Sequence, residues 1–122
     1  MIKYTNQRIK GYQRTELHGR SFHSKMEAAH YANLLLLERA KEISNIRCQV
    51  HVKLSKAEIT SIVDFLVFDH KKGIDVYHEV KGFETPEWRI KRRLWQFYGP
   101  GPLEIYSGRY SNIRLKEIII PS

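Results

Sequence analysis

Residues 62–68 form a near-continuous apolar run that only Asp64 interrupts. A short run of this kind, bounded by polar residues, is typical of a central strand whose two faces are both covered. A lone carboxylate is costly to bury in such a strand, because its lost hydration is not repaid. The run therefore predicts an α/β protein with a covered sheet. Asp64 is expected either to have a functional partner or to lie near solvent at the edge of its strand.

A second strand is predicted to return beside this run. Residues 74–81 follow a turn at residues 70–73. A four-residue loop would place Asp64 opposite Glu79, whereas a two-residue turn would place it opposite Lys81. Glu79 and Lys81 share one face, because side chains alternate along a strand. Both registers bring the three polar groups to the same face, since only a slip of one residue would turn one strand over.

Two carboxylates and an ammonium group on one surface suit a hard divalent cation beside a phosphate group. In this interpretation Asp64 and Glu79 bind Mg²⁺, for which Mn²⁺ can substitute, and the carbonyl of Val80 supplies another oxygen ligand. Lys81 would orient or help to deprotonate the attacking water and offset the charge that builds on phosphorus. The alternative is that Glu79 and Lys81 form an ordinary salt bridge on an exposed face.

A helix is predicted upstream of these strands. Ser24-Lys25-Met26-Glu27 has the spacing of a capping box, and the helix should run from Lys25 to about Ile43. Glu27 can act as the capping glutamate, which reaches back to the Ser24 amide, or as a third acidic residue of the site. Local sequence does not separate these two roles. The residues expected to face inward are Ala29, Ala32, Leu36, Ala40 and Ile43.

Thr85-Pro86 supplies an N-cap and a proline at the first helical position, and predicts a second helix that ends near Tyr98. Ile90, Leu94 and Phe97 are expected to face inward. The outer side should carry four cations, which are Arg89, Lys91, Arg92 and Arg93. A solvated face is the default interpretation of such a run. Its place directly after the strand of Glu79 favours contacts with phosphate groups, with Lys91 the best candidate to face the site.

The remaining segments complete a mixed α/β domain. Further strands are predicted at residues 47–54, 103–106 and 115–120, and Gln49 and Tyr77 are further candidates to line the site. Residues 1–20 are polar and basic and are expected to form an irregular or mobile arm. Residues 21–122 are expected to form one domain. The six histidines show no zinc-ligand spacing, and His78 should point away from Glu79.

Composition narrows the possible partners. The net charge of +8 favours a polyanion. No apolar run approaches the about 20 residues of a membrane span, and the N-terminus has no apolar signal-peptide core, so a cytoplasmic protein is expected. The single cysteine, Cys48, excludes an internal disulfide and a cysteine-rich zinc site.

These residues together resemble the PD-(D/E)XK nuclease superfamily, which has a restriction-endonuclease-like core. The matching pieces are Glu27, Asp64 within Val63-Asp64-Phe65, and Glu79-Val80-Lys81-Gly82, in αβββαβ order. More narrowly, the chain from Gly19 to Tyr106 resembles a family of small phage and prophage proteins placed in that superfamily. The strings that carry this likeness are Gly19-Arg20-Ser21-Phe22-His23-Ser24-Lys25-Met26-Glu27-Ala28, Asp64-Phe65, Val80-Lys81-Gly82 and Lys91-Arg92-Arg93-Leu94.

The resemblance implies a mixed central sheet flanked by helices and a metal-dependent endonuclease. It implies Asp64 and Glu79 as metal ligands, Lys81 as catalytic and Glu27 as an auxiliary acid. Small members of the superfamily include Holliday-junction resolvases, which act as homodimers. Two positions depart from the pattern, because Val63 replaces the proline of the superfamily's name and His23 stands where the phage family suggests an acid.

The leading hypothesis is thus a phage-type, Mg²⁺-dependent DNA endonuclease in the host cytoplasm. Branched DNA is the preferred substrate, because so small a domain has little surface for reading a long sequence. One alternative is a non-catalytic nucleic-acid-binding module of the same fold, in which Asp64 and Glu79 would fail to converge. Another is a phage structural or interaction protein, in which the acidic cluster is a salt-bridge network and binding is insensitive to salt.

Overall fold

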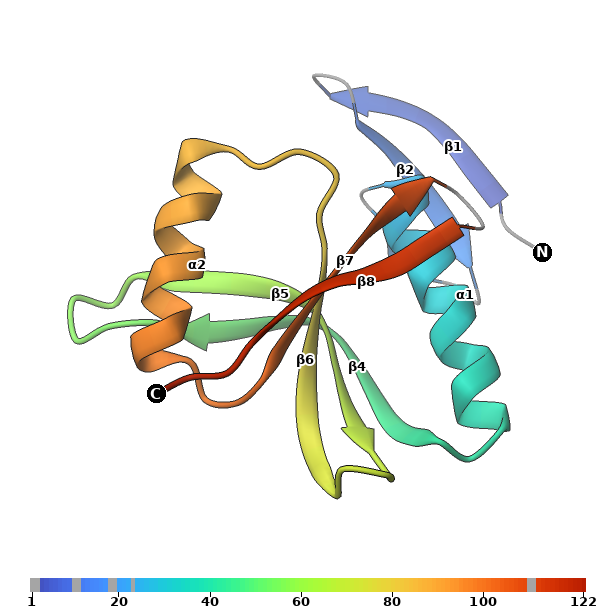
Figure 1. Cartoon of the computed structure of the whole chain (residues 1–122). Helices are drawn as coiled ribbons and strands as arrows, with labels where there is room; N and C mark the ends of the chain where they lie inside the picture. The colour runs from blue at the N-terminus through green and yellow to red at the C-terminus, as the bar shows by residue number, and fades with distance from the viewer. Residues whose placement is uncertain (1–2, 10–11, 18–19, 23, 110–111) are drawn as a thin grey trace.

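The computed structural model describes residues 3–9, 12–17, 20–22, 24–109 and 112–122. It is a mixed α/β structure with two helices and two sheets (Figure 1), so the predicted class is confirmed. The elements in chain order are β1 (Lys3–Ile9), β2 (Tyr12–Leu17), β3 (Arg20–Phe22), α1 (Lys25–Arg39), β4 (Ile43–Lys53), β5 (Thr60–Asp69), β6 (Ile74–Val80), α2 (Pro86–Tyr98), β7 (Leu103–Arg109) and β8 (Asn112–Ile119). Neither α1 nor α2 is long and apolar enough to cross a membrane, and no other helix is described.

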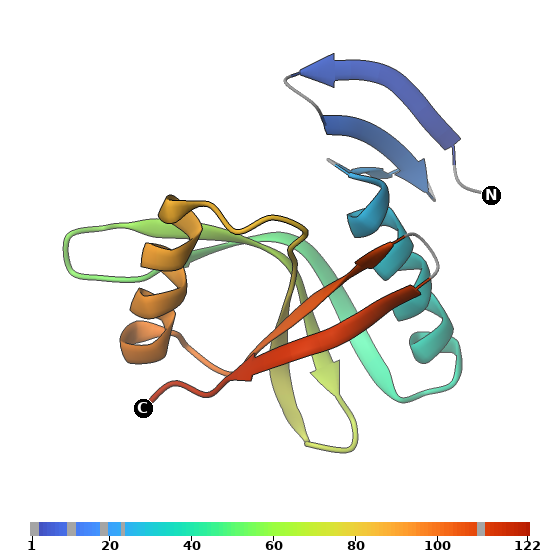
Figure 2. The ribbon, with the colours of Figure 1, turned by 45° about the horizontal axis from the view of Figure 1, so that its top comes forward.

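Five strands form one mixed sheet in the order β4-β5-β6-β7-β8. Neighbours in this sheet are antiparallel except β6 and β7, which are parallel and therefore need the long crossover that contains α2. The two helices lie on opposite faces of the sheet (Figures 1 and 2). Adjacent residues of β6 show this, since Tyr77 packs with the apolar cluster around α2 whereas His78 contacts His30 of α1.

Two apolar clusters fill the spaces between the sheet and its helices. The cluster next to α1 consists of Phe22, Ala28, Tyr31, Leu34, Ile43, Phe65 and Val67. The cluster next to α2 consists of Val52, Leu54, Val63, Trp88, Trp95, Leu103, Ile105 and Ile119. Val63 and Phe65 are only two residues apart on β5, yet they belong to different clusters. The β4–β5 hairpin therefore passes from one core to the other at Asp64.

The first helix begins as predicted but ends earlier. The Ser24 hydroxyl accepts a hydrogen bond from the Glu27 amide at 3.0 Å, which makes Ser24 the N-cap. The helix ends at Arg39, four residues before Ile43, which instead opens β4. The predicted inward stripe is confirmed only in part. Leu36 is 61% exposed and Ala40 is also exposed, whereas Ala32 packs against the cluster next to α1 and Ile43 is buried. The residues that are buried are Glu27, Ala28, His30, Tyr31 and Leu34. A run of four leucines is apolar on every side, so it does not specify which side faces the core.

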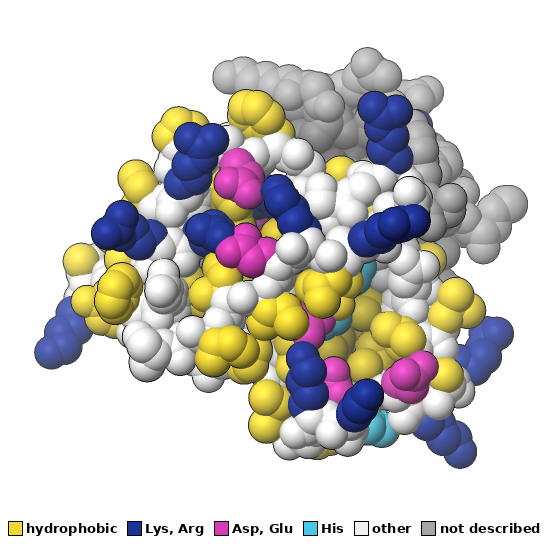
Figure 3. Space-filling view, viewed as in Figure 1, with side chains coloured by type: hydrophobic (Ala, Val, Ile, Leu, Met, Phe, Trp, Pro, Cys, Tyr) yellow, Lys and Arg dark blue, Asp and Glu magenta, His cyan; other side chains and the backbone are white. Residues whose placement is uncertain are grey.

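The second helix has the predicted cap and length, but a different buried face. The Thr85 hydroxyl accepts a hydrogen bond from the Trp88 amide at 3.0 Å. Trp88 and Trp95 are the buried residues of α2, whereas Ile90 and Phe97 are about 60% exposed, so their predicted inward position is wrong. The two indoles lie seven residues apart, which is two helical turns, and their large apolar area determines the orientation. Apolar side chains consequently remain on the surface over α2 (Figure 3).

Part of the predicted irregular arm is ordered. Strands β1 and β2 pair antiparallel, and β2 pairs with β3, to form a separate three-stranded sheet beside α1 (Figure 2). The prediction of an irregular segment is therefore wrong for residues 3–9 and 12–17, which form strands. The sequence there shows no clear alternation of apolar and polar residues, and such alternation is the main signal of a strand.

A buried polar network joins α1 to the sheet. Nε2 of His30 lies 3.0 Å from Nδ1 of His78, and Nε2 of His78 lies 3.2 Å from Oε1 of Glu104. Burial lowers the pKa of His30 to about 3 and that of His78 to about 4, because the protonated ring loses its hydration. Both rings are therefore neutral near pH 7. His78 faces α1 and points away from Glu79, as predicted.

Gly108 of β7 provides a test of the β7–β8 pairing. Its φ is +145°, and a Cβ there would lie 2.0 Å from the carbonyl oxygen of Asn112. Gly108→Ala is expected to reduce the free energy of unfolding by about 2–4 kcal/mol, as backbone strain and a clash add together. Chemical denaturation would measure this change in the free energy of unfolding. Gly73→Ala is the control, because Gly73 has a φ of +69° but open space around its Cβ position. A loss no larger than that of the control would contradict the assigned pairing.

Candidate active site

The β5–β6 hairpin has the four-residue loop, since Asp69 pairs with Ile74. The same register brings Asp64 opposite Glu79. Each carboxylate accepts a hydrogen bond from a backbone amide of the neighbouring strand. The Asp64 amide donates to Oε1 of Glu79 at 3.2 Å, and the Val80 amide donates to Oδ2 of Asp64 at 2.8 Å. The two carboxylates thus converge at the point where the hairpin passes between the two cores.

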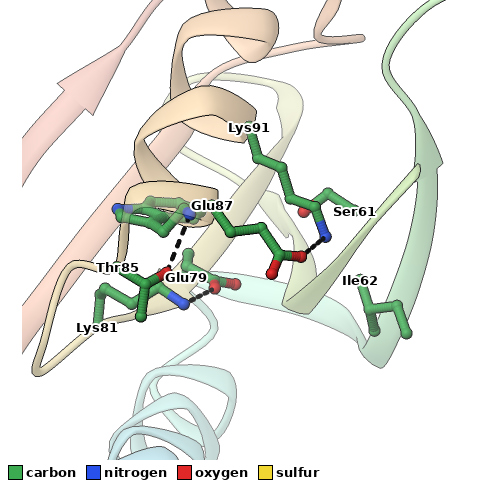
Figure 4. A pocket seen from close by; sticks show the side chains of 8 residues that line it. Ser61, Ile62, Glu79, Lys81, Thr85, Glu87 and Lys91 are labelled. Atoms are coloured by element: carbon green, nitrogen blue, oxygen red, sulfur yellow. Dashed lines mark hydrogen bonds and ion pairs between the residues drawn. The ribbon is translucent and has the colours of Figure 1, made fainter. Parts of the chain in front are cut away.

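Lys81 completes the predicted group of three. Its ammonium nitrogen lies 3.2 Å from Oε2 of Glu79 and 4.5 Å from the centre of the Trp88 ring (Figure 4). Glu79 is buried, whereas the side chain of Lys81 is 28% exposed. The ammonium group is therefore held between a carboxylate and an indole while it remains accessible from solvent.

Glu27 joins the site from α1. Its backbone amide donates to the Ser24 hydroxyl at the N-cap of the helix. Its carboxylate accepts a hydrogen bond from Nε2 of Gln49 at 2.6 Å. The side chains of Glu27 and Gln49 also act on Asp64, because both lower the pKa of its carboxyl group. Of the two roles that the sequence left open, the structure places the Glu27 side chain in the acidic cluster. Glu27 is buried, so its position is fixed by packing.

Burial dominates the electrostatics of the pair. Burial and the neighbouring charge of Asp64 raise the pKa of Glu79 to about 8, although Lys81 opposes the shift. Burial also raises the pKa of Asp64, against hydrogen bonds and the Lys81 charge, which lower it. Two adjacent buried carboxyl groups cannot both ionise at low cost. A cation between them would supply the missing compensation.

The donor set fits a hard divalent cation. Carboxylate and carbonyl oxygens are the ligands that Mg²⁺ and Mn²⁺ prefer. Asp64 and Glu79 offer two carboxylates, and the carbonyl of Val80 is the third ligand that the sequence predicts. Among the described residues no group of three His, Cys, Asp or Glu side chains is arranged to hold a metal ion. Two carboxylates and one carbonyl would leave the other positions of a six-coordinate ion to water and a phosphate oxygen.

A hollow of about 310 Å³ opens beside Glu79, whereas Asp64 and Glu27 are not among the residues that line it (Figure 4). Its lining consists of Ser61, Ile62, Glu79, Lys81, Thr85, Glu87, Trp88 and Lys91. Lys91 reaches it from α2, as predicted, and its ammonium nitrogen lies 3.3 Å from Oε1 of Glu87. Trp88 was not anticipated as a site residue, although its place in the first turn after the Thr85 cap could have indicated it. The predicted candidate Tyr77 instead packs against Trp95 in the α2 core.

The other three cations of α2 do not share the side of Lys91. Arg92 is half-buried and pairs with Glu117 of β8, and Arg89 lies 3.9 Å from a carboxylate oxygen of Glu84. Arg93 is exposed and lines a shallow apolar hollow on the outer side of α2. The prediction that all four cations lie on one outer face is therefore wrong. A helix turns about 100° per residue, so adjacent cations point in different directions.

A family model described as "Protein of unknown function (DUF1064)" matches residues 1–120. The chain belongs to this family. No curated protein and no solved structure matches the chain significantly. This description assigns no activity to the family. His23, where the phage family suggests an acid, lies outside the described residues.

Proposed function

We propose that the protein is a Mg²⁺-dependent endonuclease of the PD-(D/E)XK type that hydrolyses phosphodiester bonds in DNA. The observation that carries the proposal is the convergence of Asp64 and Glu79 with the Lys81 ammonium group 3.2 Å away. An αβββαβ segment with a mixed sheet between two helices is compatible with a restriction-endonuclease-like core. A salt-bridge network on an exposed face would keep its carboxylates hydrated. Here burial raises the pKa of both Asp64 and Glu79, which disfavours their charged forms.

Asp64, Glu79 and the Val80 carbonyl would hold Mg²⁺, or Mn²⁺ in its place. When bound, the ion supplies a Lewis acid that polarises the phosphate and the attacking water. Lys81 is placed to hydrogen-bond that water and to offset negative charge on the phosphate. Glu27 would act on Asp64, because its side chain lowers the pKa of that carboxyl group. Lys91 lines the hollow next to Glu79 and can bind a phosphate group of the strand.

The proposed substrate is branched DNA, as in a Holliday junction, and the proposed assembly is a homodimer with one site for each strand. The net charge of +8 supports a nucleic-acid partner. The described part of the chain has two helices and two small sheets, which leave little surface beyond the site for reading a long sequence. A phage-type enzyme of this kind would act in the host cytoplasm.

Cleavage of a four-way junction and of a linear duplex of the same sequence tests this proposal. The wild type is expected to cut the junction faster, only with Mg²⁺ or Mn²⁺, and Asp64→Asn is expected to show no detectable cutting. Binding of both DNAs should weaken steeply as salt rises, because phosphate contacts release counterions. Failure of the wild type to cut either DNA, or undiminished cutting by Asp64→Asn, would exclude the proposed activity.

A further inference from the structure

Strand β4 contains two residues other than glycine with a left-handed backbone, Asn45 at a φ of 54° and Gln49 at a φ of 53°. The pairing of β4 with β5 explains the first, because the register shifts between Ser44 and Arg47. Asparagine also tolerates this conformation better than most residues. Asn45 therefore belongs to an ordinary irregularity of the strand.

Gln49 has no such explanation. Cys48 pairs with Phe65 and Val50 pairs with Val63, so the register is the same on both sides of Gln49. No inserted residue has to be accommodated there. A left-handed backbone is unfavourable for glutamine, and conformations of this kind concentrate at functional sites, where the surrounding structure maintains them.

The conformation brings the Gln49 carboxamide to the acidic cluster. Nε2 donates to Oε2 of Glu27 at 2.6 Å. Gln49 also lies opposite Asp64 on the neighbouring strand, between the pairs Cys48–Phe65 and Val50–Val63, and its side chain lowers the pKa of the Asp64 carboxyl group. A carboxamide nitrogen carries two N–H donors and no charge. Glutamine can therefore bond to two neighbouring carboxylates and hold them in place without occupying a cation's position.

We propose that Gln49 is a positioning residue, whose left-handed backbone directs its carboxamide onto Glu27 and Asp64 so that Asp64 is held ready to bind the metal ion. This inference rests on the proposed nuclease function. In this role Gln49 acts only through the two carboxylates. The competing explanation is purely structural, in which a left-handed residue is needed only to bend β4 between the two cores.

Three variants separate these explanations. Gln49→Gly keeps access to the left-handed backbone and removes the carboxamide. Gln49→Glu keeps the shape and removes the N–H donors. Asn45→Gly is the matched control, because it changes the other left-handed residue of the same strand at a distance from the site. The readouts are the Mg²⁺ dissociation constant from titration calorimetry, the Mg²⁺ concentration for half-maximal cleavage, and kcat on junction DNA.

Both Gln49 variants are expected to weaken Mg²⁺ binding or lower kcat by about 10–100-fold, as loss of a residue that orients a metal ligand typically does. Asn45→Gly is expected to leave all three readouts unchanged. Wild-type Mg²⁺ affinity and kcat in Gln49→Gly would overturn the proposal, because the bend alone would then explain the conformation.

A measurement without metal or DNA keeps this inference separate from the proposed activity. A double-mutant cycle of Gln49→Gly and Glu27→Gln should give a coupling of roughly 2-fold or more in the unfolding equilibrium constant. If the wild type does not cut DNA but the cycle is coupled and Mg²⁺ binding depends on Gln49, the nuclease proposal fails and the positioning role stands. If the cycle shows no coupling, the positioning role fails whatever the wild type cuts.

Discussion

Glu79→Gln is expected to abolish metal-dependent cleavage of DNA and, at the same time, to stabilise the metal-free protein at alkaline pH. The first effect follows from the loss of one of two carboxylate ligands beside Lys81. A bound ion contributes several kcal/mol of transition-state stabilisation, so the expected loss in kcat is about 1,000-fold or more. Cleavage of a radioactive or fluorescent junction substrate under single-turnover conditions would measure this loss of rate.

The second effect follows from the pKa of Glu79, which burial raises to about 8 from an ordinary value of 4.5. The folded state therefore binds the proton more tightly than the unfolded chain. Its contribution to stability is fully present below pH 4.5 and is lost as the pH rises through about 8. Glutamine is neutral throughout and avoids this loss. The melting temperature of Glu79→Gln in EDTA should exceed that of the wild type above about pH 8, and the difference should shrink toward about pH 5.

Glu87→Gln is the control for this second effect. Glu87 lines the same hollow, but its side chain is 77% exposed, so Glu87→Gln removes a carboxylate from the hollow without touching the buried Glu79. If Glu79→Gln showed the same dependence of melting temperature on pH as the wild type, the carboxyl group would be ionised without cost in the folded state. The buried, destabilised pair on which the proposed metal site depends would then be absent.

Trp95→Ala is expected to cause the largest loss of stability among single changes in α2. Trp95 is 1% exposed, its indole donates to the Gly101 carbonyl at 2.9 Å, and the Tyr77 ring packs edge-on at 5.0 Å. Truncation of such a side chain costs about 3–5 kcal/mol, which is a large part of a typical total of about 5–15 kcal/mol. Because α2 carries Lys91 and Trp88, the loss should also disturb the hollow beside Glu79.

Phe97→Ala is the matched change on the same helix, two residues away. The Phe97 side chain is 59% exposed, so its truncation should alter the free energy of unfolding by no more than about 0.5 kcal/mol. Urea denaturation of both variants measures the difference. Equal losses would mean that α2 packs on the sheet with the face that the sequence pattern suggested, through Ile90 and Phe97, and that the arrangement around the candidate site is different.

Local sequence was sufficient for the β5–β6 hairpin and the start of α2. Side chains alternate along a strand, so Asp64, Glu79 and Lys81 had to share a face in either register. The four-residue loop then decided between the two. The cap at Thr85 and the proline after it likewise determine where α2 begins. Both features depend on residues close together in the chain, whose geometry varies little between proteins.

The tertiary structure alone decided which sides of the helices are buried and which distant groups meet Asp64. The sequence offered Glu27 and Gln49 as candidates for the site, but only the tertiary structure brings them together from α1 and β4, where Gln49 donates to Glu27. Local patterns describe a side chain's direction relative to its own element. Which face of α2 is buried depends on which apolar side chains of the distant strands it packs against, and the two tryptophans bury the most apolar area there. The same packing of distant elements brings the carboxylates together where the two cores meet.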